Sequence, residues 1–421
     1  MLDLLVIGAG LSGLMAAYTA AKSGLSVRVI NKGLGSMHWS AATVDLLGYT
    51  YSNQKQSVKR PFTNITALRD SNPDHPYALL TEDGIRFALG EFVALTKEIG
   101  LPYGGSGSGD NLFLPSPAGA PRPTYLAPQA QLAGDLGRSE PMLIVGFKGM
   151  RDFFPHLIAD NLIRLGYTAR AAFLPLDLIT ARRDANTIHL AKELDDGARR
   201  VKLGKALKNF AQKGERIGLP AILGLNQHAQ ALVELNKLCE VPLFEIPTLP
   251  PSVPGVRLYT AVRNKLQQMN VRVEPAMEVI ASSTVDGQVE WVESETSARP
   301  YRQRAQSYLL ATGGILGSGF DSDHSGHIWE TIFDLPITPP QDRSQWFHSS
   351  FFSSEGHPVF HGGVTVNRNF QPIDASGQVI YTNLWAAGNI LAGSDPILER
   401  SLEGAAIVTG IAAGRSIVKG Q

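Results

Sequence analysis

The stretch that decides the fold is residues 2–31, LDLLVIGAGLSGLMAAYTAAKSGLSVRVIN. Leu2–Ile7 is a short continuous apolar run, which is typical of a strand buried on both faces. Leu11–Ser23 is rich in Ala, Leu and Met and is followed by Gly24, a pattern that predicts a helix ending at a glycine. Leu25–Asn31 predicts a second strand. The stretch therefore predicts one βαβ unit, and with it an α/β fold built on a Rossmann-like parallel sheet.

The turn between the first strand and the helix carries the pattern GxGxxG at residues 8–13. Gly8 permits the tight turn, Gly10 lets a pyrophosphate approach the backbone, and Gly13 lets helix and strand pack closely. The N–H groups and the dipole of the helix N-terminus, at Leu11 and Ser12, would stabilise the phosphates. Because the pattern joins a buried strand to a helix, it predicts a dinucleotide-binding site.

The second strand ends without the acidic residue that usually binds the ribose in such sites. Asn31 and Lys32 stand there instead. An asparagine can still form a hydrogen bond with a ribose hydroxyl, but the bond is weaker than one to a carboxylate. We therefore expect a weaker contact with the adenosine half of the ligand.

Two later motifs indicate that the nucleotide is a flavin. Residues 307–311 predict a strand that runs into a small-residue turn at 312–314, after a predicted β-meander. Residues 384–389 predict a strand and a glycine turn, and a final amphipathic helix is expected after Ser401. The N-terminus of that helix, beside the N1/O2 edge of a flavin, would stabilise the anion formed on reduction. The predicted cofactor-binding residues are Gly8, Gly10, Leu11, Ser12, Gly13, Asn31, Lys32, His38, Ser40, Val279, Ala311, Thr312, Gly313, Gly388, Asn389, Ser401, Leu402, Glu403, Gly404 and Ala405.

Length and composition narrow the possible functions. The 421 residues suit two or three domains, and 38 basic against 38 acidic residues leave no surplus for binding nucleic acid. Cys239 is the only cysteine, so iron–sulfur centres cannot be ligated within this chain by cysteines, and a reducing, intracellular setting is expected. Charged residues interrupt the apolar stretches, so no direct membrane insertion is expected. We expect residues 1–74 and 241–421 to form the dinucleotide-binding domain, with an inserted α/β domain at 75–240.

Several stretches resemble the B subunits of anaerobic glycerol-3-phosphate dehydrogenase. They include HPYALL at 75–80, MRDFFPHLIADNL at 150–162, LPPSVPGVRL at 249–258 and the tail from Asn383 to Ala413. The resemblance implies a flavin subunit that works beside a catalytic FAD subunit and an iron–sulfur subunit that anchors the complex to the inner membrane from the cytoplasm. The complex would oxidise sn-glycerol 3-phosphate to dihydroxyacetone phosphate and pass the electrons to quinone. The family also suggests FMN, whereas GxGxxG favours FAD, so we expect FAD with FMN as the alternative.

Three residues are candidates for a direct role in the chemistry. His38 follows the second strand, where the related fumarate reductase-type flavoproteins place residues beside the flavin. We expect His38 to pack beside the flavin ring, and the alternative is a covalent bond between His38 and the flavin. His361 precedes a glycine pair and could face a substrate or the flavin edge, although a loop histidine bonded to backbone is the commoner outcome. Arg400 could neutralise a substrate anion or a reduced flavin, or it could instead be solvated or form a salt bridge with another subunit. The pairs His357/His361 and His324/His327 have no third ligand at metal spacing, so no metal is expected.

Three functions follow from these patterns. The leading hypothesis is an electron-relaying flavin subunit, because no clear acid–base pair for taking a proton from an alcohol is found. The second is a self-contained FAD oxidoreductase of the fumarate reductase or aspartate oxidase type. Such an enzyme needs a pair of arginines that bind the substrate anion over the flavin, and only Arg400 is a candidate. The third is a structural subunit that has lost its flavin, which only Asn31 favours.

Overall fold

The computed structural model describes residues 2–50, 56–183, 185–296, 299–340 and 342–421. The chain divides into two compact units. The first unit comprises Met1–Ser36, Asp45–Leu95 and Val262–Gln421, and the second comprises Met37–Val44 and Thr96–Ala261. The domain boundaries that we expect at residues 75 and 240 stay a prediction.

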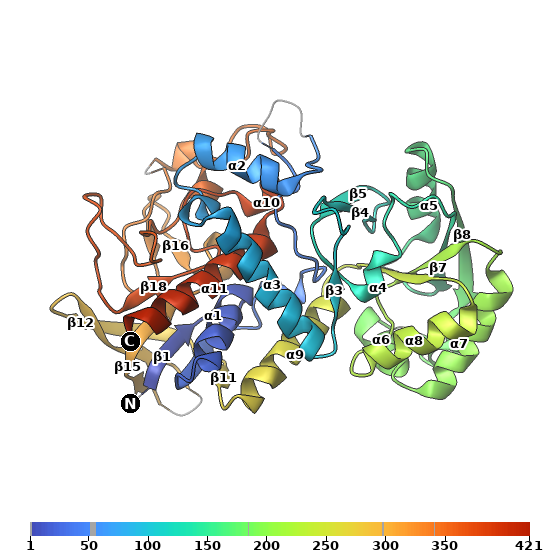
Figure 1. Cartoon of the computed structure of the whole chain (residues 1–421), viewed down its shortest axis with the longest axis horizontal. Helices are drawn as coiled ribbons and strands as arrows, with labels where there is room; N and C mark the ends of the chain where they lie inside the picture. The colour runs from blue at the N-terminus through green and yellow to red at the C-terminus, as the bar shows by residue number, and fades with distance from the viewer. Residues whose placement is uncertain (1, 51–55, 184, 297–298, 341) are drawn as a thin grey trace. The chain divides into compact units, whose positions relative to one another are not determined.

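The first unit is built on a five-stranded parallel sheet, as the opening stretch predicts (Figure 1). In spatial order its strands are β11 (Arg272–Pro275), β2 (Val27–Asn31), β1 (Leu2–Ile7), β15 (Ala305–Leu310) and β18 (Leu384–Ala386). From β1 the chain adds strands outward on one side, to β2 and β11, and later returns to the other side with β15 and β18. In open α/β sheets, ligands bind at the carboxyl ends of the strands where the order reverses, which here lies between β1 and β15.

Helices α1 (Leu11–Lys22) and α11 (Leu402–Gly420) pack side by side with very little space between their backbones (Figure 1). A Cβ added at Gly410 would lie 2.3 Å from the carbonyl oxygen of Ser12, and one at Gly414 would lie 3.0 Å from that of Ala16. Every residue of α11 from 404 to 411 is buried. The expectation of an amphipathic helix is therefore wrong for this part of α11, which is buried on every side, whereas exposed residues such as Arg415 and Lys419 occur only near its C-terminus.

The remaining elements of the first unit include the predicted β-meander. Strands β12 and β13 are joined by Asp286 and Gly287, both with positive φ, as a two-residue hairpin turn requires. The meander consists of β12 (Val279–Val285), β13 (Gln288–Ser294) and β14 (Tyr301–Gln303), and a separate pair consists of β16 (Phe320–Ser322) and β17 (Ile328–Glu330). The other helices are α2 (Pro61–Ser71), α3 (Glu82–Glu98), α9 (Val253–Gln268), which continues from the second unit, and α10 (Pro396–Glu399).

The second unit contains its own four-stranded parallel sheet. Its strands, in spatial order, are β10 (Leu243–Ile246), β9 (Arg216–Pro220), β7 (Met142–Lys148) and β8 (Ala169–Pro175). Its main helices are α5 (Pro155–Arg164), α6 (Thr187–Glu193), α7 (Gly197–Phe210) and α8 (His228–Cys239). The irregular stretch before β7 contains β3 (Tyr103–Gly104), β4 (Leu112–Pro115), β5 (Pro121–Thr124), β6 (Ala127–Pro128) and α4 (Gln129–Leu132).

One segment of the second unit differs from the strand that its sequence suggests. The apolar run 221–225, which predicts a strand, is a loop that follows β9. The N–H of Ala221 still donates to Ile246 of β10, but further along the N–H of Leu223 donates to the side chain of Glu245 and that of Leu225 to Asp195. An apolar run alone does not distinguish a strand from a loop whose backbone N–H groups are bound by carboxylates.

A buried charged network follows this loop. Arg257 forms two hydrogen bonds with the carboxylate of Glu245, at 2.7 and 2.9 Å. His228 donates from Nδ1 to the carbonyl oxygen of Leu223 at 2.7 Å. Burial, followed by the charge of Arg257, lowers the pKa of His228 from 6.5 to about 4. The imidazole is therefore neutral in the folded protein at pH 7.

Among the described residues, no helix has the length and hydrophobicity needed to cross a bilayer.

The neutral, buried His228 predicts how stability depends on pH. The unfolded chain protonates this histidine below pH 6.5 and the folded protein only near pH 4, so the unfolded state gains protons first and stability falls in that interval. His228→Asn keeps a hydrogen-bond donor for the carbonyl of Leu223 but does not titrate. Between pH 6.5 and 4 its free energy of unfolding should therefore fall by up to about 3 kcal/mol less than that of the native chain. Urea unfolding across this range measures the difference. His156→Asn, at an exposed position, is the control and should follow the native curve.

The close packing of α1 and α11 predicts opposite effects of the same substitution at two helical glycines. Gly410→Ala should lower the free energy of unfolding by about 1–3 kcal/mol, because its Cβ meets the backbone of Ser12. Gly90→Ala, in exposed helical backbone with no described atom within 4 Å of the new Cβ, should raise it by about 0.5–1 kcal/mol. Urea midpoints that shift equally and in the same direction would contradict the packing described.

Candidate functional site

The predicted glycine turn lies between β1 and α1, and two of its glycines cannot be replaced without moving the backbone. Gly8 has φ +116° and donates its N–H to Ile30. A Cβ added there would lie 2.2 Å from the carbonyl oxygen of Ala311, at the end of β15. A Cβ added at Gly13 would lie 2.1 Å from the carbonyl oxygen of Gly8. These contacts fix the turn at the place where the strand order reverses.

Gly10 differs from Gly8 and Gly13, because a Cβ added at Gly10 would have no described atom within 4 Å. Gly10 is the N-cap residue of α1, with φ −70° and ψ 176°, and no side chain caps the helix. The first N–H groups of a helix have no partner within the helix and attract anions. An open glycine in front of these N–H groups forms a cradle for a phosphate, with Leu11 and Ser12 in its first turn.

The turn after β18 packs against this cradle. Gly388 has φ +83°, and a Cβ there would lie 2.3 Å from Oγ of Ser12. Its N–H donates to Oγ1 of Thr409 at 2.9 Å. Thr409 is buried in α11 and is not among the predicted site residues, because nothing in the sequence links it to a turn about twenty residues earlier. Its hydroxyl holds the Gly388–Asn389 turn against the first turn of α1.

Asn31 presents a buried acceptor at the carboxyl end of β2. Its Nδ2 donates to the carbonyl oxygen of Gly33, while its Oδ1 is buried and has no hydrogen-bond partner among the described residues. The backbone carbonyl of Asn31 accepts from Met277, two residues before Val279 at the start of β12. Lys32 forms an exposed ion pair with Glu278 at 2.6 Å. The unpaired Oδ1 is placed where a ribose hydroxyl is bound in dinucleotide sites.

A second buried polar atom lies at the end of β15. The N–H of Ala311 donates to Ile7 at 2.8 Å, so this strand end lies beside the end of β1. Oγ1 of Thr312 is buried and has no partner among the residues that the structure describes. Gly313 has φ +72°, and the N–H of Gly314 donates to the carbonyl oxygen of Asn389 at 3.0 Å. The turns after β15 and β18 are thereby joined.

The residues of this edge fit a bound FAD. The cradle at Gly10 leaves room for a pyrophosphate at a helix N-terminus. Two buried polar atoms, Oδ1 of Asn31 and Oγ1 of Thr312, need partners that the described chain does not supply. All of them lie along the carboxyl edge of one parallel sheet.

Comparison with known proteins identifies the family. A family model described as "FAD binding domain" matches residues 3–401. A protein of Halobacterium salinarum (strain ATCC 29341 / DSM 671 / R1), named as a probable B subunit of anaerobic glycerol-3-phosphate dehydrogenase, is 33% identical, covering 98% of this chain and 96% of the relative. The B subunit of the same enzyme from Aliivibrio fischeri (strain MJ11) is 30% identical over 99% and 95% of the two chains. The chain belongs to this family of FAD-binding B subunits.

The comparisons confirm the resemblance and the FAD prediction. Among solved structures, the 3-ketosteroid delta1-dehydrogenase of Sterolibacterium denitrificans aligns over 100% of this chain and 99% of its own, at 10% identity and a TM-score of 0.46. That similarity is too low to support an argument about ligand or activity.

Arg400 is engaged in an ion pair with Asp45. It has φ +51°, and its Nη2 and Nε lie 2.8 and 3.2 Å from Oδ2 of Asp45. Burial lowers the pKa of Arg400, but the charge and the hydrogen bonds of Asp45, together with the charge of Glu403, raise the pKa overall. Asp45 cannot be identified from the sequence, because it lies 355 residues from its partner. This ion pair lies within the chain, and a role of Arg400 at a substrate or a reduced flavin stays a prediction.

A buried hydrogen-bond network surrounds the start of α11. Oε2 of Glu399 lies 3.0 Å from Nε2 of His75 and 2.7 Å from Oγ of Ser401. Nδ1 of His75 accepts from the N–H of Tyr77, so its proton is on Nε2 and is donated to the carboxylate. The three side chains of His75, Glu399 and Ser401 are at most 1% exposed. Their bonds fix the turn that leads from α10 into α11.

The segment 45–48 holds the first turn of α11 from another direction. The N–H of Gly404 donates to the carbonyl oxygen of Asp45 at 3.2 Å. The hydroxyl of Tyr77 donates to Leu46 at 2.6 Å and would lie 2.6 Å from a Cβ added at Gly404. Burial raises the pKa of Tyr77 well above its usual value, so the phenol stays protonated. The predicted residues Leu402, Glu403, Gly404 and Ala405 thus form one fixed helical turn.

The predicted flavin neighbours His38 and Ser40 belong to the second unit. The ring of His38 lies 4.9 Å from the ring of Tyr259, and its carbonyl accepts from Ser252 at 2.7 Å. Oγ of Ser40 accepts from the N–H of Ala42 at 3.0 Å. Their place beside the flavin, and the choice between packing and a covalent bond at His38, stay predictions.

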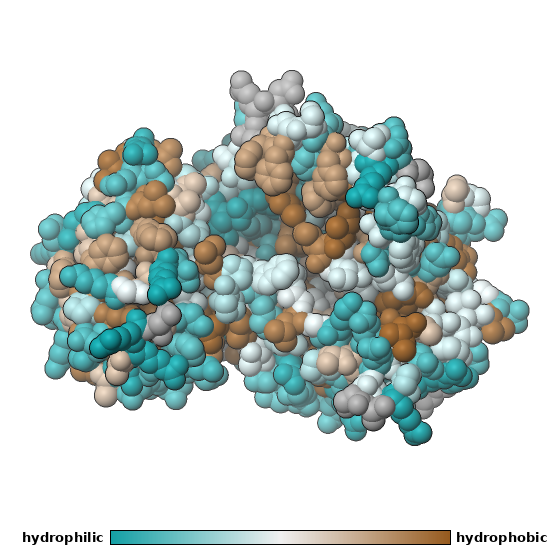
Figure 2. Space-filling model, turned by 180° about the vertical axis from the view of Figure 1, so that it is seen from behind, coloured by the Kyte–Doolittle hydropathy of each residue, from teal (hydrophilic) through white to brown (hydrophobic). Residues whose placement is uncertain are grey.

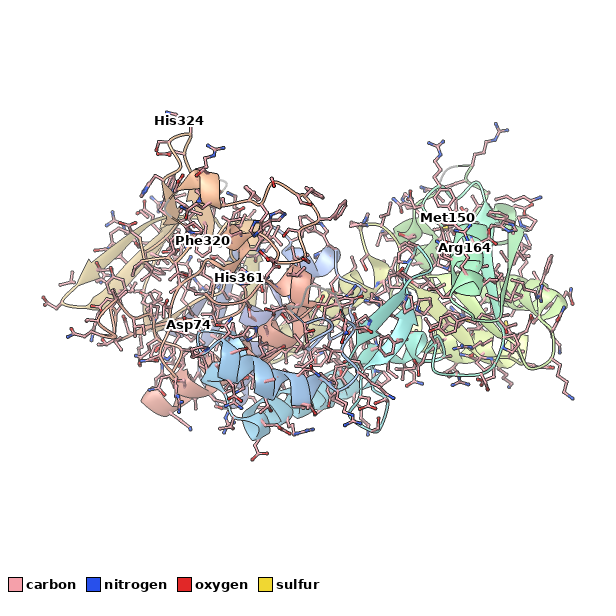
Figure 3. All side chains as sticks on the ribbon, turned by 90° about the horizontal axis from the view of Figure 1, so that it is seen from above. Asp74, Met150, Arg164, Phe320, His324 and His361 are labelled. Carbon is pink, nitrogen blue, oxygen red and sulfur yellow. The ribbon has the colours of Figure 1, made fainter. Side chains whose placement is uncertain are left out.

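His361 lies in the first unit at the end of a 3₁₀ turn, Pro358–His361, and its carbonyl accepts from Gly393 at 2.9 Å. Figure 3 shows His361 well apart from His324, which lies on a projecting loop. His357 uses both ring nitrogens, since Nδ1 accepts from His348 and Nε2 donates to Phe351. Within the described part of the chain, no three His, Cys, Asp or Glu side chains are grouped as metal ligands.

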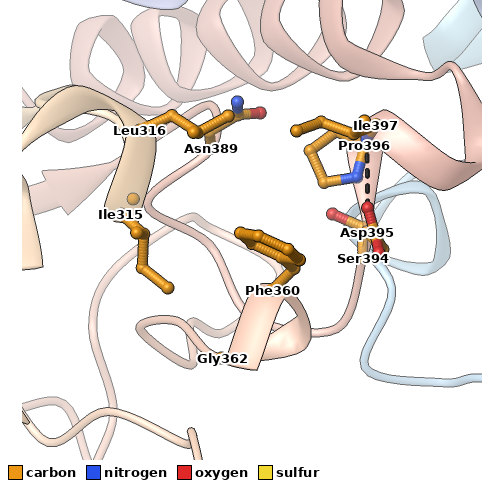
Figure 4. A pocket seen from close by; sticks show the side chains of 10 residues that line it. Ile315, Leu316, Phe360, Gly362, Asn389, Ser394, Asp395, Pro396 and Ile397 are labelled. Atoms are coloured by element: carbon orange, nitrogen blue, oxygen red, sulfur yellow. Dashed lines mark hydrogen bonds between the residues drawn. The ribbon is translucent and has the colours of Figure 1, made fainter. Parts of the chain in front are cut away.

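A small hollow, open to solvent, lies beside the joined turns (Figure 4). The side chain of Phe360 lies between Ile315 on one side and Pro396 on the other. The lining residues are Gly314, Ile315, Leu316, Phe360, Gly362, Asn389, Ser394, Asp395, Pro396 and Ile397. No sequence pattern indicates this hollow, because its residues come from segments that are separate along the chain.

The open cradle predicts a variant that loses FAD but keeps its fold. Gly10→Ala places a methyl group where no described protein atom lies, so the melting temperature of the cofactor-free chain should be nearly unchanged. The methyl group occupies the space for the pyrophosphate, so the Kd for FAD should rise at least about tenfold, or about 1.4 kcal/mol. Calorimetric titration with FAD measures this. Gly90→Ala is the matched control, and an equal Kd for both variants would contradict the assignment.

Proposed function

We propose that this chain is the flavin subunit of a heteromeric sn-glycerol-3-phosphate dehydrogenase and relays electrons between two partner subunits. The full-length similarity to proteins named as B subunits of such an enzyme carries this proposal. The partners would be a catalytic FAD subunit and an iron–sulfur subunit, with quinone reached indirectly. The chain would lie in the cytoplasm, peripheral to the inner membrane, and would be held there by a partner.

The state of Arg400 favours a relay over a self-contained oxidoreductase. An enzyme of the second kind needs arginines that bind the substrate anion, and Arg400 is the only candidate in the sequence. Its guanidinium forms two hydrogen bonds with Asp45, which leaves less of its charge for a substrate.

The third hypothesis, a structural subunit without a flavin, is disfavoured by the cradle. A subunit that no longer binds a flavin does not need an open glycine at position 10 or a buried, unpaired hydrogen-bond acceptor at Asn31. Both features are present. Retaining an unpaired buried polar group costs about 1–3 kcal/mol, which a bound ribose would recover.

The chain's own residues would bind and tune the flavin, whose ring supplies the electron-accepting chemistry. The first turn of α1 would bind the pyrophosphate, Asn31 would accept a hydrogen bond from a ribose hydroxyl, and Thr312 would contact the part of the cofactor between these two groups. The N-terminus of α11, from Leu402, would face the N1/O2 edge and stabilise negative charge there. Glu399 and Asp45 keep this helix end in place. Cys239 takes no part, because burial raises the pKa of its thiol to about 12.

An absorption spectrum of the purified chain tests the proposal. We expect a bound flavin that acid releases as FAD and that sn-glycerol 3-phosphate, added anaerobically, does not bleach in the absence of partners. Bleaching should follow when the catalytic subunit is added. Bleaching by the substrate alone would make this chain the dehydrogenase itself, and a folded chain that binds no added FAD would support the structural role. Yellow colour that stays in the acid pellet would indicate a covalent bond.

A further inference from the structure

Thr409 places a hydroxyl group in the buried part of α11. Its side chain is 0% exposed, and its neighbours along the helix, Val408 and Gly410, are buried as well. Figure 2 shows hydrophilic side chains over much of one face of the molecule, where water satisfies such groups. A hydroxyl that is buried among helices costs free energy unless the protein itself supplies its hydrogen-bond partners. The bonds that Thr409 makes therefore account for its place in this helix.

The hydroxyl of Thr409 both donates and accepts a hydrogen bond. Its Oγ1 donates to the carbonyl oxygen of Ala405 at 2.6 Å, one turn earlier in α11. A threonine within a helix often forms such a bond. The same oxygen accepts from the N–H of Gly388 at 2.9 Å, in the turn after β18. The second bond leaves the helix, so the hydroxyl connects α11 to this turn.

Gly388 is the residue at which the chain leaves the sheet. The N–H of Ala387 still donates to Leu310 of β15 at 3.0 Å, whereas that of Gly388 donates to Thr409. Gly388 has φ +83°, and its carbonyl accepts from Leu391 at 3.1 Å within the turn. A buried N–H that loses its acceptor is unfavourable. Without the oxygen of Thr409, we therefore expect the turn to change its position.

Ser12, in the first turn of α1, is held in place by two glycines. A Cβ added at Gly388 would lie 2.3 Å from Oγ of Ser12, and one added at Gly410 would lie 2.3 Å from its carbonyl oxygen. Gly410 follows Thr409 in α11, and Gly388 is bonded to Thr409. The position of Ser12 is therefore fixed from α11, on one side directly and on the other through the hydroxyl of Thr409.

We propose that Thr409 is a positioning residue for the flavin. Its hydroxyl holds Gly388 against Ser12, and this contact keeps the first turn of α1 in the geometry that binds the phosphates of the cofactor. The inference rests on the flavin site of the proposed function. Because protein covers its side chain on all sides, Thr409 acts through Gly388 and Ser12 and not by touching the cofactor.

The same hydroxyl joins both ends of the expected site. Ala405 belongs to the start of α11, which we expect beside the flavin ring, whereas Ser12 belongs to the cradle for the pyrophosphate. A cofactor that contacts both needs a constant distance between them, because binding groups have to be held within about 0.5 Å of their productive positions. The two bonds of Thr409 meet this requirement, since they tie the turn after β18 to the first turns of α11.

The test is Thr409→Val, which keeps the shape of the side chain but removes the hydroxyl. The N–H of Gly388 then loses its acceptor and the turn moves relative to Ser12, so the Kd for FAD should rise about tenfold. Calorimetric titration of the cofactor-free chain with FAD, well below the melting temperatures of both proteins, measures this value. Thr409→Ser keeps the hydroxyl and should bind FAD like the native chain. A merely structural Thr409 would change the melting temperature and leave the Kd unchanged.

The control is Ile417→Val, which removes one methyl group from a buried position later in the same helix. It should lower the melting temperature and leave the Kd for FAD unchanged, because it alters packing without touching the turn after β18. Equal Kd values for the native chain and Thr409→Val would overturn the inference and leave the FAD site intact. A weakening as large as that of Thr409→Val in Ile417→Val or in Thr409→Ser would also overturn it. A native chain that binds no FAD would overturn the flavin site of the proposed function itself.

Discussion

The close approach of the glycine turn after β1 to the end of β15 is the constraint on which the first unit depends. The Gly8 position has no room for a side chain, because Ala311 occupies that space from a strand far along the sequence. The same contact puts the carboxyl ends of β1 and β15 side by side, and a parallel sheet offers its ligand site there. The cradle at Gly10, the acceptor at Asn31 and the hollow beside Asn389 all lie along this edge.

A second constraint is electrostatic. Carboxylates can be buried only if hydrogen-bond donors surround them, and Glu399 and Asp45 find theirs in His75, Ser401 and Arg400. These bonds place the N-terminus of α11 in one position, although α11 itself is held mainly by packing against α1. A preorganised helix end needs no rearrangement when charge develops beside it, which is what an electron-relaying subunit requires.

Local signals are enough to predict the βαβ unit, the glycine turn and the Asp286–Gly287 hairpin, because each depends on residues close together in the sequence. The ion pair of Arg400 cannot be predicted in this way, since its partner Asp45 is 355 residues away. The loop at 221–225 resembles a strand in sequence, because the side chains that satisfy its backbone are distant along the chain. The burial of α11 cannot be predicted for a similar reason, because the apolar pattern of one helix does not show how many neighbouring elements cover it.

If this edge of the sheet binds a dinucleotide flavin, both halves of the cofactor must contact it. The most direct measurement compares the Kd values of FAD and FMN for the native chain, Asn31→Leu and Asn31→Asp. Leucine removes the acceptor for the ribose, so FAD should bind about tenfold more weakly while FMN, which has no adenosine, is unaffected. Aspartate keeps an acceptor and should retain FAD. Equal losses for FAD and FMN, or a native chain that prefers FMN, would contradict a site that binds both halves.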